Sequence, residues 1–442
     1  MTRPTMPLAI LAFAALPVAA DLGVPAAPVQ PIDPDGYRPI DADLAALGQL
    51  LFYDPILSGN ANISCGTCHH PDFGTADGVA LSLGEGGVGL GPDRVAAPGN
   101  LPEQFIPRHA PGLWNLGHVE FSVMFHDGRL ELDGTRPSGI RTPLGPEMEM
   151  GFASVLSAQA MFPVLSADEM AGHYSENDIA EAVRIGRITG EDGAWDLLTD
   201  RLEAIPEYRA AFTESFGPGD IQFTDVADAI AVFIEFEWRA DDSPFDAYLR
   251  GERNLPEPAL RGMALFYGTA GCAACHSGPF QTDHAFHATG LVQFGPGKRA
   301  RFEDHRRDDG RFRVTGDPAD QFAFRTPSLR NVALTAPYGH TGAYATLETF
   351  LVAHLAPRAA WDDFDRDTAI LPHLPGAAPF AAVDDAQMQA AVLDAVAEPD
   401  RVLAEDEIAD LVAFLHALTD PAGAAGRLGV PDAVPSGLPL DR

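Results

Sequence analysis

The sequence predicts a mainly α-helical protein made of two related domains with long loops. Hydrophobic residues recur mostly with helical spacing, and no region is rich in strand patterns. Two distant segments also share one arrangement, in which an apolar helical stretch precedes a C-x-x-C-H motif. The chain has 442 residues, enough for two or three domains. We place a signal peptide at 1–20, domains at 21–240 and 241–420, and a tail at 421–442.

The first twenty residues predict a secretory signal peptide. Residues 8–20 (LAILAFAALPVAA) form a short apolar run that ends in small residues before Asp21, with Arg3 as the basic residue ahead of it. The run is short for a membrane span, and no later stretch approaches about 20 apolar residues. No cysteine at the predicted cleavage site offers a lipid anchor. We therefore expect a periplasmic protein without a membrane span.

The first domain is expected to combine an extended arm, a helix, a long loop and further helices. Residues 21–37 are rich in Pro and Asp and predict the arm. Four leucines share one face of a predicted helix at 41–52, and Gly and Pro then dominate 71–112. Helical patterns follow at 178–216 and 223–239.

The second domain repeats part of this order. Residues 241–258 are polar and contain proline, which indicates a linker. A helix at 259–267 precedes the second C-x-x-C-H motif, as the helix at 41–52 precedes the first. Residues 405–418 form an amphipathic closing helix, and the Pro/Gly-rich tail is expected to be loose.

The two motifs are attachment signatures for c-type haem. They are Cys65-Gly66-Thr67-Cys68-His69 and Cys272-Ala273-Ala274-Cys275-His276, and they use all four cysteines of the chain. In such a motif the two thiols bond to the haem vinyl groups and the histidine ligates iron. The alternative is a zinc ribbon built from both C-x-x-C pairs. A ribbon needs no histidine after each pair, so we predict two cytochrome c-like domains with one covalent haem each.

A strongly acidic composition limits the partners. The formal net charge is -34, which argues against nucleic acid. A basic redox partner fits this charge, as does a simple requirement for solubility. The basic stretch at 298–313 is interleaved with acids and predicts a salt-bridged loop.

Beyond the haem motifs, further segments resemble the bacterial di-haem cytochrome c peroxidase family, which includes the methylamine dehydrogenase maturase MauG. The resemblance covers nearly all of the mature chain, in the same order. The matching segments are Leu51-Phe52-Tyr53-Asp54, Arg108-His109-Ala110-Pro111, Asn115, Asp127-Gly128-Arg129, Glu149-Met150, Ser243-Pro244-Phe245-Asp246, Asp309-Gly310-Arg311, Arg325-Thr326-Pro327-Ser328-Leu329-Arg330-Asn331-Val332 and Thr335-Ala336-Pro337-Tyr338-Gly339-His340.

The resemblance implies that the two haems have different functions. The haem on His69 is then the high-spin site for hydrogen peroxide, and the haem on His276 is six-coordinate and transfers electrons. The resemblance also implies a calcium ion between the haems, held by the Asn115 side chain and the carbonyls of Thr335 and Pro337. Such neutral oxygen ligands suit calcium.

The resemblance places Glu149, His126 and Arg129 at the catalytic site. The family has a glutamate six residues after a proline, and Pro143 and Glu149 reproduce that spacing. Peroxide cleavage needs a group that takes a proton from one oxygen and returns it to the other, which a carboxylate can do. Glu147, two residues earlier, is the alternative.

Two departures from the family pattern concern iron ligation. Where well-studied members cap the first haem with a removable histidine, this chain has Glu85. A carboxylate substitutes poorly for imidazole, so we expect the first haem to be open even when oxidised. Where members have Met or Tyr as the sixth ligand of the second haem, Thr346-Leu347-Glu348 leads to His354. Ligation by two histidines would lower the potential of that haem.

A third departure lies between the haems, where His126 replaces the usual Trp before Asp127-Gly128-Arg129. Electrons then cannot pass between the haems through a tryptophan side chain. His126 either forms hydrogen bonds at this position or simply packs there. The predicted function is a periplasmic peroxidase that takes electrons from a small c-type cytochrome or cupredoxin. The alternatives are a MauG-like oxidase that acts on residues of a partner protein and a non-catalytic di-haem electron carrier.

Overall fold

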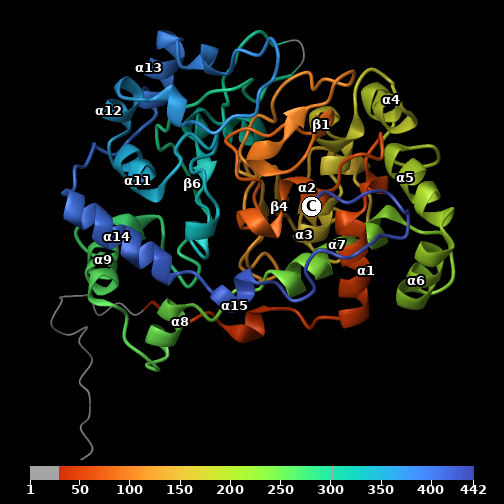
Figure 1. Ribbon diagram of the computed structural model, residues 1–442, viewed down its shortest axis with the longest axis horizontal. Coiled ribbons are helices and arrows are strands. Elements are labelled where there is room, and N and C mark those ends of the chain that lie inside the picture. Colours follow the sequence, from red (N-terminus) through yellow and green to blue (C-terminus); the bar gives the residue numbers. More distant parts are fainter. Residues whose placement is uncertain (1–28, 301–302) are drawn as a thin grey trace, which may run out of the picture.

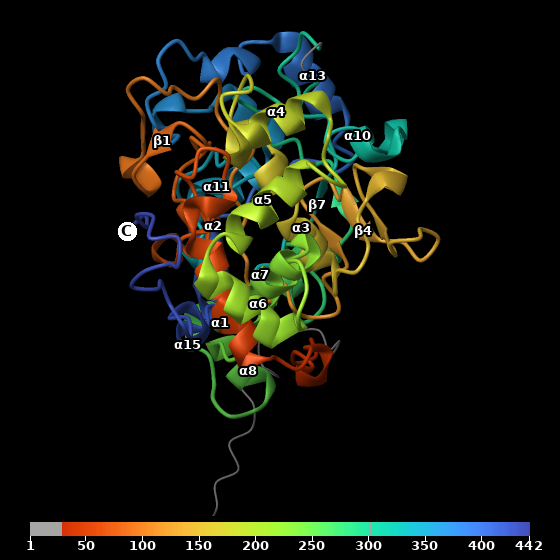
Figure 2. The same cartoon turned by 90° about the vertical axis from the view of Figure 1, so that its right-hand side faces the viewer.

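The computed structural model describes residues 29–300 and 303–442, so the predicted signal peptide lies outside the described residues. The described chain is mainly helical, as predicted, with long loops between the helices (Figures 1 and 2). Its helices are α1 Ala42–Tyr53, α2 Cys65–Cys68, α3 Val155–Ala160, α4 Asp178–Ile185, α5 Ala194–Glu203, α6 Pro206–Phe216, α7 Phe223–Glu237, α8 Pro244–Leu249, α9 Glu257–Tyr267, α10 Phe312–Thr315, α11 Leu347–Leu355, α12 Pro357–Asp362, α13 Ala386–Asp394, α14 Glu405–Ala417 and α15 Pro421–Ala424.

The strands of the described chain are short and pair antiparallel, and these pairings hold neighbouring loop segments together. β1 (Gly87–Val88) pairs with β2 (Val95–Ala96), and β6 (Phe286–His287) pairs with β7 (Phe324–Arg325). β4 (Leu130–Leu132) lies between β3 (Val123–Met124) and β5 (Ile140–Arg141). No described helix is long and apolar enough to cross a membrane.

Two helix pairs organise the two halves of the molecule. In the N-terminal half α1 packs against α7, and in the C-terminal half α9 packs against α14 (Figure 1). A glycine lies at each crossing, because a Cβ on Gly48 would lie 1.9 Å from the Ala229 carbonyl oxygen and one on Gly262 would lie 1.8 Å from that of Asp410. The two halves therefore share a close helix crossing as well as the motif that follows it.

Three hydrophobic cores fill the described molecule. One lies in the N-terminal half and includes Phe52, Phe233 and Trp238. The second lies around α9 and α14. The third joins residues 80–105 to residues 291–392, so the halves share a core as well as a chain connection.

Several sequence predictions of local structure need correction. The helical pattern at 178–216 is three helices, α4 to α6. The expected linker at 241–258 contains α8, where Asp246 is buried and paired with Arg330 at 2.8 Å. Burying the apolar ring of Phe245 in the second core explains why this polar segment folds.

The tail is not loose. It returns from the C-terminal half to the N-terminal half and ends near α2 (Figure 1). The Glu237 carboxylate accepts hydrogen bonds from the backbone N–H groups of residues 427–429. Val434 joins the first core, and Thr67 donates to Asp441 at 2.6 Å. Pro and Gly here set turns in a docked segment, which composition alone does not distinguish from a loose one.

Candidate haem-binding sites

The first C-x-x-C-H motif forms a helical turn that presents His69. Residues Cys65–Cys68 are α2, and the His69 backbone N–H donates to the Cys65 carbonyl at 2.9 Å. The His69 Nδ1 lies 2.9 Å from the Thr75 carbonyl oxygen. A carbonyl accepts only, so Nδ1 carries the proton and donates, which leaves Nε2 as the metal-binding nitrogen. Burial lowers the pKa of His69, and the neutral ring is the form that ligates a metal.

The second motif repeats this arrangement. Cys272–Ala274 is a 3₁₀ turn, and the His276 N–H donates to the Cys272 carbonyl at 2.9 Å. The His276 Nδ1 lies 3.0 Å from the Gln281 carbonyl oxygen. Burial lowers the pKa of His276 as well. Both proximal histidines are therefore held with Nε2 available and the ring neutral.

The arrangement of the cysteines contradicts a shared zinc ribbon. Cys65 and Cys68 pack against the first core and Cys272 against the second. Within the described residues, no cluster of potential metal ligands contains two of the four cysteines. All four thiols are free of disulfides, and burial raises the pKa of Cys65 and Cys68 to about 12.

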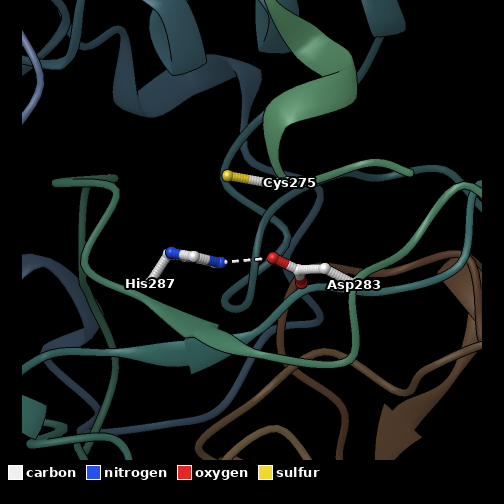
Figure 3. A group of neighbouring side chains, drawn as sticks. All are labelled: Cys275, Asp283 and His287. Atoms are coloured by element: carbon white, nitrogen blue, oxygen red, sulfur yellow. Dashed lines mark hydrogen bonds and ion pairs between the residues drawn. The ribbon is translucent and has the colours of Figure 1, made fainter.

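A second polar group adjoins the second motif. Cys275 points toward Asp283 and His287, and the His287 Nε2 lies 2.8 Å from the Asp283 Oδ2 (Figure 3). A cysteine, a carboxylate and an imidazole at this spacing suit zinc. Because Cys275 is the second cysteine of the C-x-x-C-H motif, its sulfur would be used by the predicted haem attachment and would not be free to bind zinc.

His354 faces His276. It lies in the last turn of α11, on the same face as the buried Leu347 and Leu351. The ring centres of His276 and His354 are 6.4 Å apart, with an interplanar angle of 67°. A metal–imidazole bond is about 2 Å long and the ring centre lies about 1 Å farther, so imidazoles on opposite sides of one metal have centres roughly 6 Å apart. The separation fits two ligands of one iron.

The surroundings of His354 suit a ligand more than a packed histidine. Burial, and then His276, lower the pKa of His354 to about 4, so the ring is neutral. Its Nδ1 is buried without a hydrogen-bond partner, and its ring stacks on Phe350 at 5.3 Å. His340, another buried histidine of the C-terminal half, stacks on Phe324 instead.

The two candidate acids differ in exposure. Glu149 is half-buried and follows Met148, which belongs to the first core. Glu147 ends a 3₁₀ turn and is exposed. Neither carboxylate forms a hydrogen bond or ion pair with the described residues. Partial burial beside the core makes Glu149 the better placed of the two to face a cofactor in this domain.

Glu85 is a buried residue of the loop before β1. Its Oε1 accepts hydrogen bonds from the side-chain amides of Asn60, Asn62 and Asn100, at 2.8, 2.9 and 2.8 Å. Arg94 fastens the same loop by donating to the carbonyls of residues 83, 84 and 89. The carboxylate that stands in for the capping histidine is therefore fixed by three amides.

His126 lies where the two halves meet. The Arg325 backbone N–H donates to its carbonyl at 2.8 Å. Burial, followed by the charge of Arg108, holds the pKa of His126 well below its usual range. The lowered pKa keeps the ring neutral, and the ring forms no hydrogen bond with the described residues, so the structure offers no hydrogen-bonded bridge through His126.

A buried ion network surrounds this position. Arg108 donates to both oxygens of Asp308, at 2.6 and 2.8 Å, and to Asp127 at 2.8 Å. Arg129 pairs with Asp127 at 3.0 Å and lies 3.4 Å over the Phe125 ring. The guanidinium of Arg129 is thus already engaged by a carboxylate and an aromatic ring.

Two cations at this interface were missed by the sequence reasoning. Arg325 has no carboxylate within ion-pair distance among the described residues, and burial lowers its pKa to about 10. Lys298 likewise lacks an ion pair there, and burial lowers its pKa to about 8. Enclosed cations need anions, and haem carries two propionates. The sequence predicts that Lys298 lies in a salt-bridged loop, and it holds no signal that the neighbouring residues leave this lysine without an ion pair.

One of the three predicted calcium ligands, the Asn115 side chain, is already engaged. The Asn115 Oδ1 already accepts hydrogen bonds from the Tyr37 hydroxyl and the Ala240 N–H, both at 2.7 Å. Its Nδ2 donates to the Ala240 carbonyl at 2.8 Å. Asn115 therefore joins the N-terminal arm to the end of α7 and offers no free oxygen for calcium.

Comparison with known proteins gives a consistent result. Residues 42–254 match the family model described as di-haem cytochrome c peroxidase. The chain is 31% identical over 351 residues to the cytochrome c551 peroxidase of Nitrosomonas europaea, covering 79% of this chain and 83% of the relative. It is 31% identical over 317 residues to the methylamine utilization protein MauG of Methylorubrum extorquens, covering 71% and 69%.

Solved structures agree on the fold. A MauG-like protein associated with microbial copper homeostasis is 27% identical, with a TM-score of 0.55 and coverage of 90% of this chain and 94% of that one. The diheme peroxidase BthA from Burkholderia thailandensis is 22% identical, with a TM-score of 0.56 and coverage of 93% and 94%. The second likeness concerns the fold alone.

Proposed function

Because the chain belongs to the di-haem cytochrome c peroxidase family, we propose that it is a periplasmic peroxidase that reduces hydrogen peroxide with electrons from a small redox protein. Each half is then a cytochrome c-like domain with one haem, attached through Cys65 and Cys68 or through Cys272 and Cys275. The bound haems supply the iron centres at which peroxide is reduced and electrons are passed. The residues around each haem determine which iron reduces peroxide and which one transfers electrons.

The observation that carries the proposal is the difference between the two proximal histidines. His276 faces the imidazole of His354 at a separation that fits one iron between them. No second histidine packs against the His69 ring among the described ring contacts, and Glu85 is engaged by three amides. One site is thus built for a saturated electron-transfer haem and the other for a haem with an open face.

Glu149 is the group that moves the proton. Its half-buried carboxylate has no partner in the described chain, so it is free to accept a proton from one peroxide oxygen and return it to the departing one. His126 stays neutral and packs between the halves, and Arg129 holds Asp127 in place.

Arg325 and Lys298 hold the haem propionates. Arg325 belongs to β7, which pairs with β6 in the segment after the second motif, and we therefore assign it to the second haem. Lys298 lies near Arg129, Arg108 and Glu169, and it serves the first. A carboxylate beside each cation would offset its cost of burial.

The calcium site and the electron donor are specified less closely than the haem sites. Asn115 offers no free oxygen here, so no step of this proposal depends on calcium. A net charge of -34 favours a donor with a basic face, such as a small c-type cytochrome or a cupredoxin. In the MauG-like alternative the electrons come from residues of a partner protein, and the same haem sites would serve.

The experiment compares Glu149→Gln with Glu147→Gln in haem-loaded protein. Both changes keep size and polarity and remove proton transfer. We expect Glu149→Gln to keep both haems and their resting spectra but to react with peroxide about 10²–10⁴-fold more slowly in stopped-flow measurements, while Glu147→Gln reacts as the wild type does. A slow Glu147 variant with a normal Glu149 variant would reverse the assignment. Normal rates in both would favour the electron-carrier alternative.

A further inference from the structure

A histidine and two carboxylates meet on the N-terminal half, in a cluster that the peroxidase mechanism does not use. The His173 Nδ1 lies 3.4 Å from the Glu103 Oε2, and its Nε2 lies 3.9 Å from the Asp168 Oδ1. One potential ligand atom from each residue falls within 4.8 Å of the others. Asp168 is part of the π-helical turn Ala167–Ala171, and Glu103 comes from the loop after β2.

The imidazole of His173 lacks the hydrogen bonds that a buried ring normally makes. His173 is 7% exposed, and both of its ring nitrogens are buried without a hydrogen-bond partner. Buried polar side chains nearly always have one. The two carboxylates that the ring faces lie close to its nitrogens, at 3.4 and 3.9 Å, but form no hydrogen bond with them.

We propose that Glu103, Asp168 and His173 bind a divalent first-row transition-metal ion, with Zn²⁺ as the representative. With bonds of about 2 Å, ligands of a tetrahedral ion lie roughly 3.3 Å apart. The observed 3.4 and 3.9 Å need little adjustment. One imidazole and two carboxylates are ligands that zinc accepts, and water completes the coordination.

The surroundings support a built site. The Gln104 Nε2 donates to the Asp168 Oδ2 at 2.8 Å, which orients the carboxylate and leaves Oδ1 toward His173. The His173 backbone N–H donates to Glu176 at 3.0 Å, which fixes the base of the histidine. Glu103 is exposed, so an ion can enter from solvent and meet the buried imidazole behind it.

The site adjoins the loop that carries Glu85. The Asp168 carbonyl accepts the Glu85 backbone N–H at 3.1 Å. A Cβ on Gly84 would lie 2.0 Å from the same carbonyl oxygen, so the two segments are in close contact. A metal at Asp168 would therefore bind directly beside the loop that carries Glu85.

The test is calorimetric titration of chelator-treated, haem-loaded protein with Zn²⁺. We expect one ion per chain in the wild type. Loss of one outer-shell partner alone costs metal sites about 10–100-fold in affinity, so His173→Ala should weaken binding roughly tenfold or more. His416→Ala, at an exposed histidine outside the cluster, should leave the affinity unchanged.

Glu103→Gln guards against misfolding of the His173 variant, because Glu103 is exposed and its replacement disturbs no core. It should weaken Zn²⁺ binding while the haem absorption spectrum stays normal. Equal affinity in the wild type and in both variants would overturn the proposal, as would a wild type that binds no Zn²⁺. Because no peroxide is involved, either outcome leaves the proposed peroxidase function untouched.

Discussion

At the scale of single residues, the role of each histidine follows from what its ring nitrogens contact. His69 and His276 each face a backbone carbonyl through Nδ1, which directs Nε2 to a metal. His354 lies opposite His276, and His126 is kept neutral between cations. The motifs alone predict His69 and His276 as iron ligands, because each histidine directly follows the second cysteine of its motif.

For the other residues of the candidate sites, the sequence gives a weaker indication of their role or none. His354 was predicted from its distance to Thr346, a spacing that the helix α11 turns into a shared face with Leu347. Arg325 and Lys298 could not be predicted, because the absence of a counter-ion is a property of the folded interface. Asn115 was predicted as a calcium ligand, yet its hydrogen bonds to Tyr37 and Ala240 come from segments far away in sequence.

Replacing His354 by Met tests the second haem site. A thioether favours ferrous iron more than imidazole does, so His354→Met should raise the midpoint potential of one haem and leave the other unchanged. Redox titration followed by absorption measures this. His340→Met is the matched control and should leave both potentials in place. A shift with His340→Met and none with His354→Met would assign the ligand to His340.

At the scale of elements, the longer helices were predictable and the irregular segments were not. The patterns at 41–52, 223–239, 259–267 and 405–418 correspond to α1, α7, α9 and α14 within a few residues. These helices bury one face in a core, which fixes their hydrophobic spacing. The linker and the tail are held instead by scattered contacts, such as Arg330 with Asp246, which leave no periodic signal.

The glycine at the α9–α14 crossing is expected to be necessary for close packing. A Cβ at residue 262 would lie 1.8 Å from the Asp410 carbonyl oxygen, so the helices would have to separate. Overpacking of this kind costs roughly 1–3 kcal/mol, and Gly262→Ala should lower the free energy of unfolding by that amount. Gly134→Ala, where a Cβ meets nothing within 4 Å, is the control. Equal effects of both changes in chemical denaturation would contradict the close crossing.

At the scale of the whole molecule, the two halves are joined by a shared core, by the returning tail and by buried charges. Arg108 pairs with Asp127 of its own half and with Asp308 of the other. Burial would raise the pKa of Asp127, but Arg108 and Arg129 hold it below its usual range, and the pKa of Asp308 is lowered too. The halves are therefore held together by ionised carboxylates.

Removing Arg108 should destabilise the protein in a pH-dependent way. Arg108→Met leaves the buried Asp308 without an ion pair and Asp127 with Arg129 alone, and breaking such a buried pair costs about 3–5 kcal/mol at neutral pH. Because the folded-state pKa values are depressed, the stabilisation is complete above the unfolded pKa of about 3.9 and is lost as the pH falls below it. Denaturation of wild type and variant at pH 7 and at pH 3.5 should show a smaller difference at the acidic pH.

A control variant at an exposed arginine separates this effect from the general loss of an arginine's hydrogen bonds. Arg427→Met removes a guanidinium that hydrogen-bonds to backbone carbonyls of the N-terminal half and holds no carboxylate in an ion pair. The loss in free energy of unfolding caused by Arg427→Met should be the same at the two pH values. If Arg108→Met lowers the free energy of unfolding equally at both pH values, the network does not stabilise the protein through ionised Asp127 and Asp308.

The account as a whole depends on a first haem that is open before any reduction. Stopped-flow absorption of the fully oxidised, haem-loaded protein mixed with hydrogen peroxide tests this most directly. Since Glu85 is held by three asparagine amides where a capping imidazole would stand, we predict an immediate spectral change without added reductant. An oxidised protein that stays inert, and reacts only after one-electron reduction, would contradict the account.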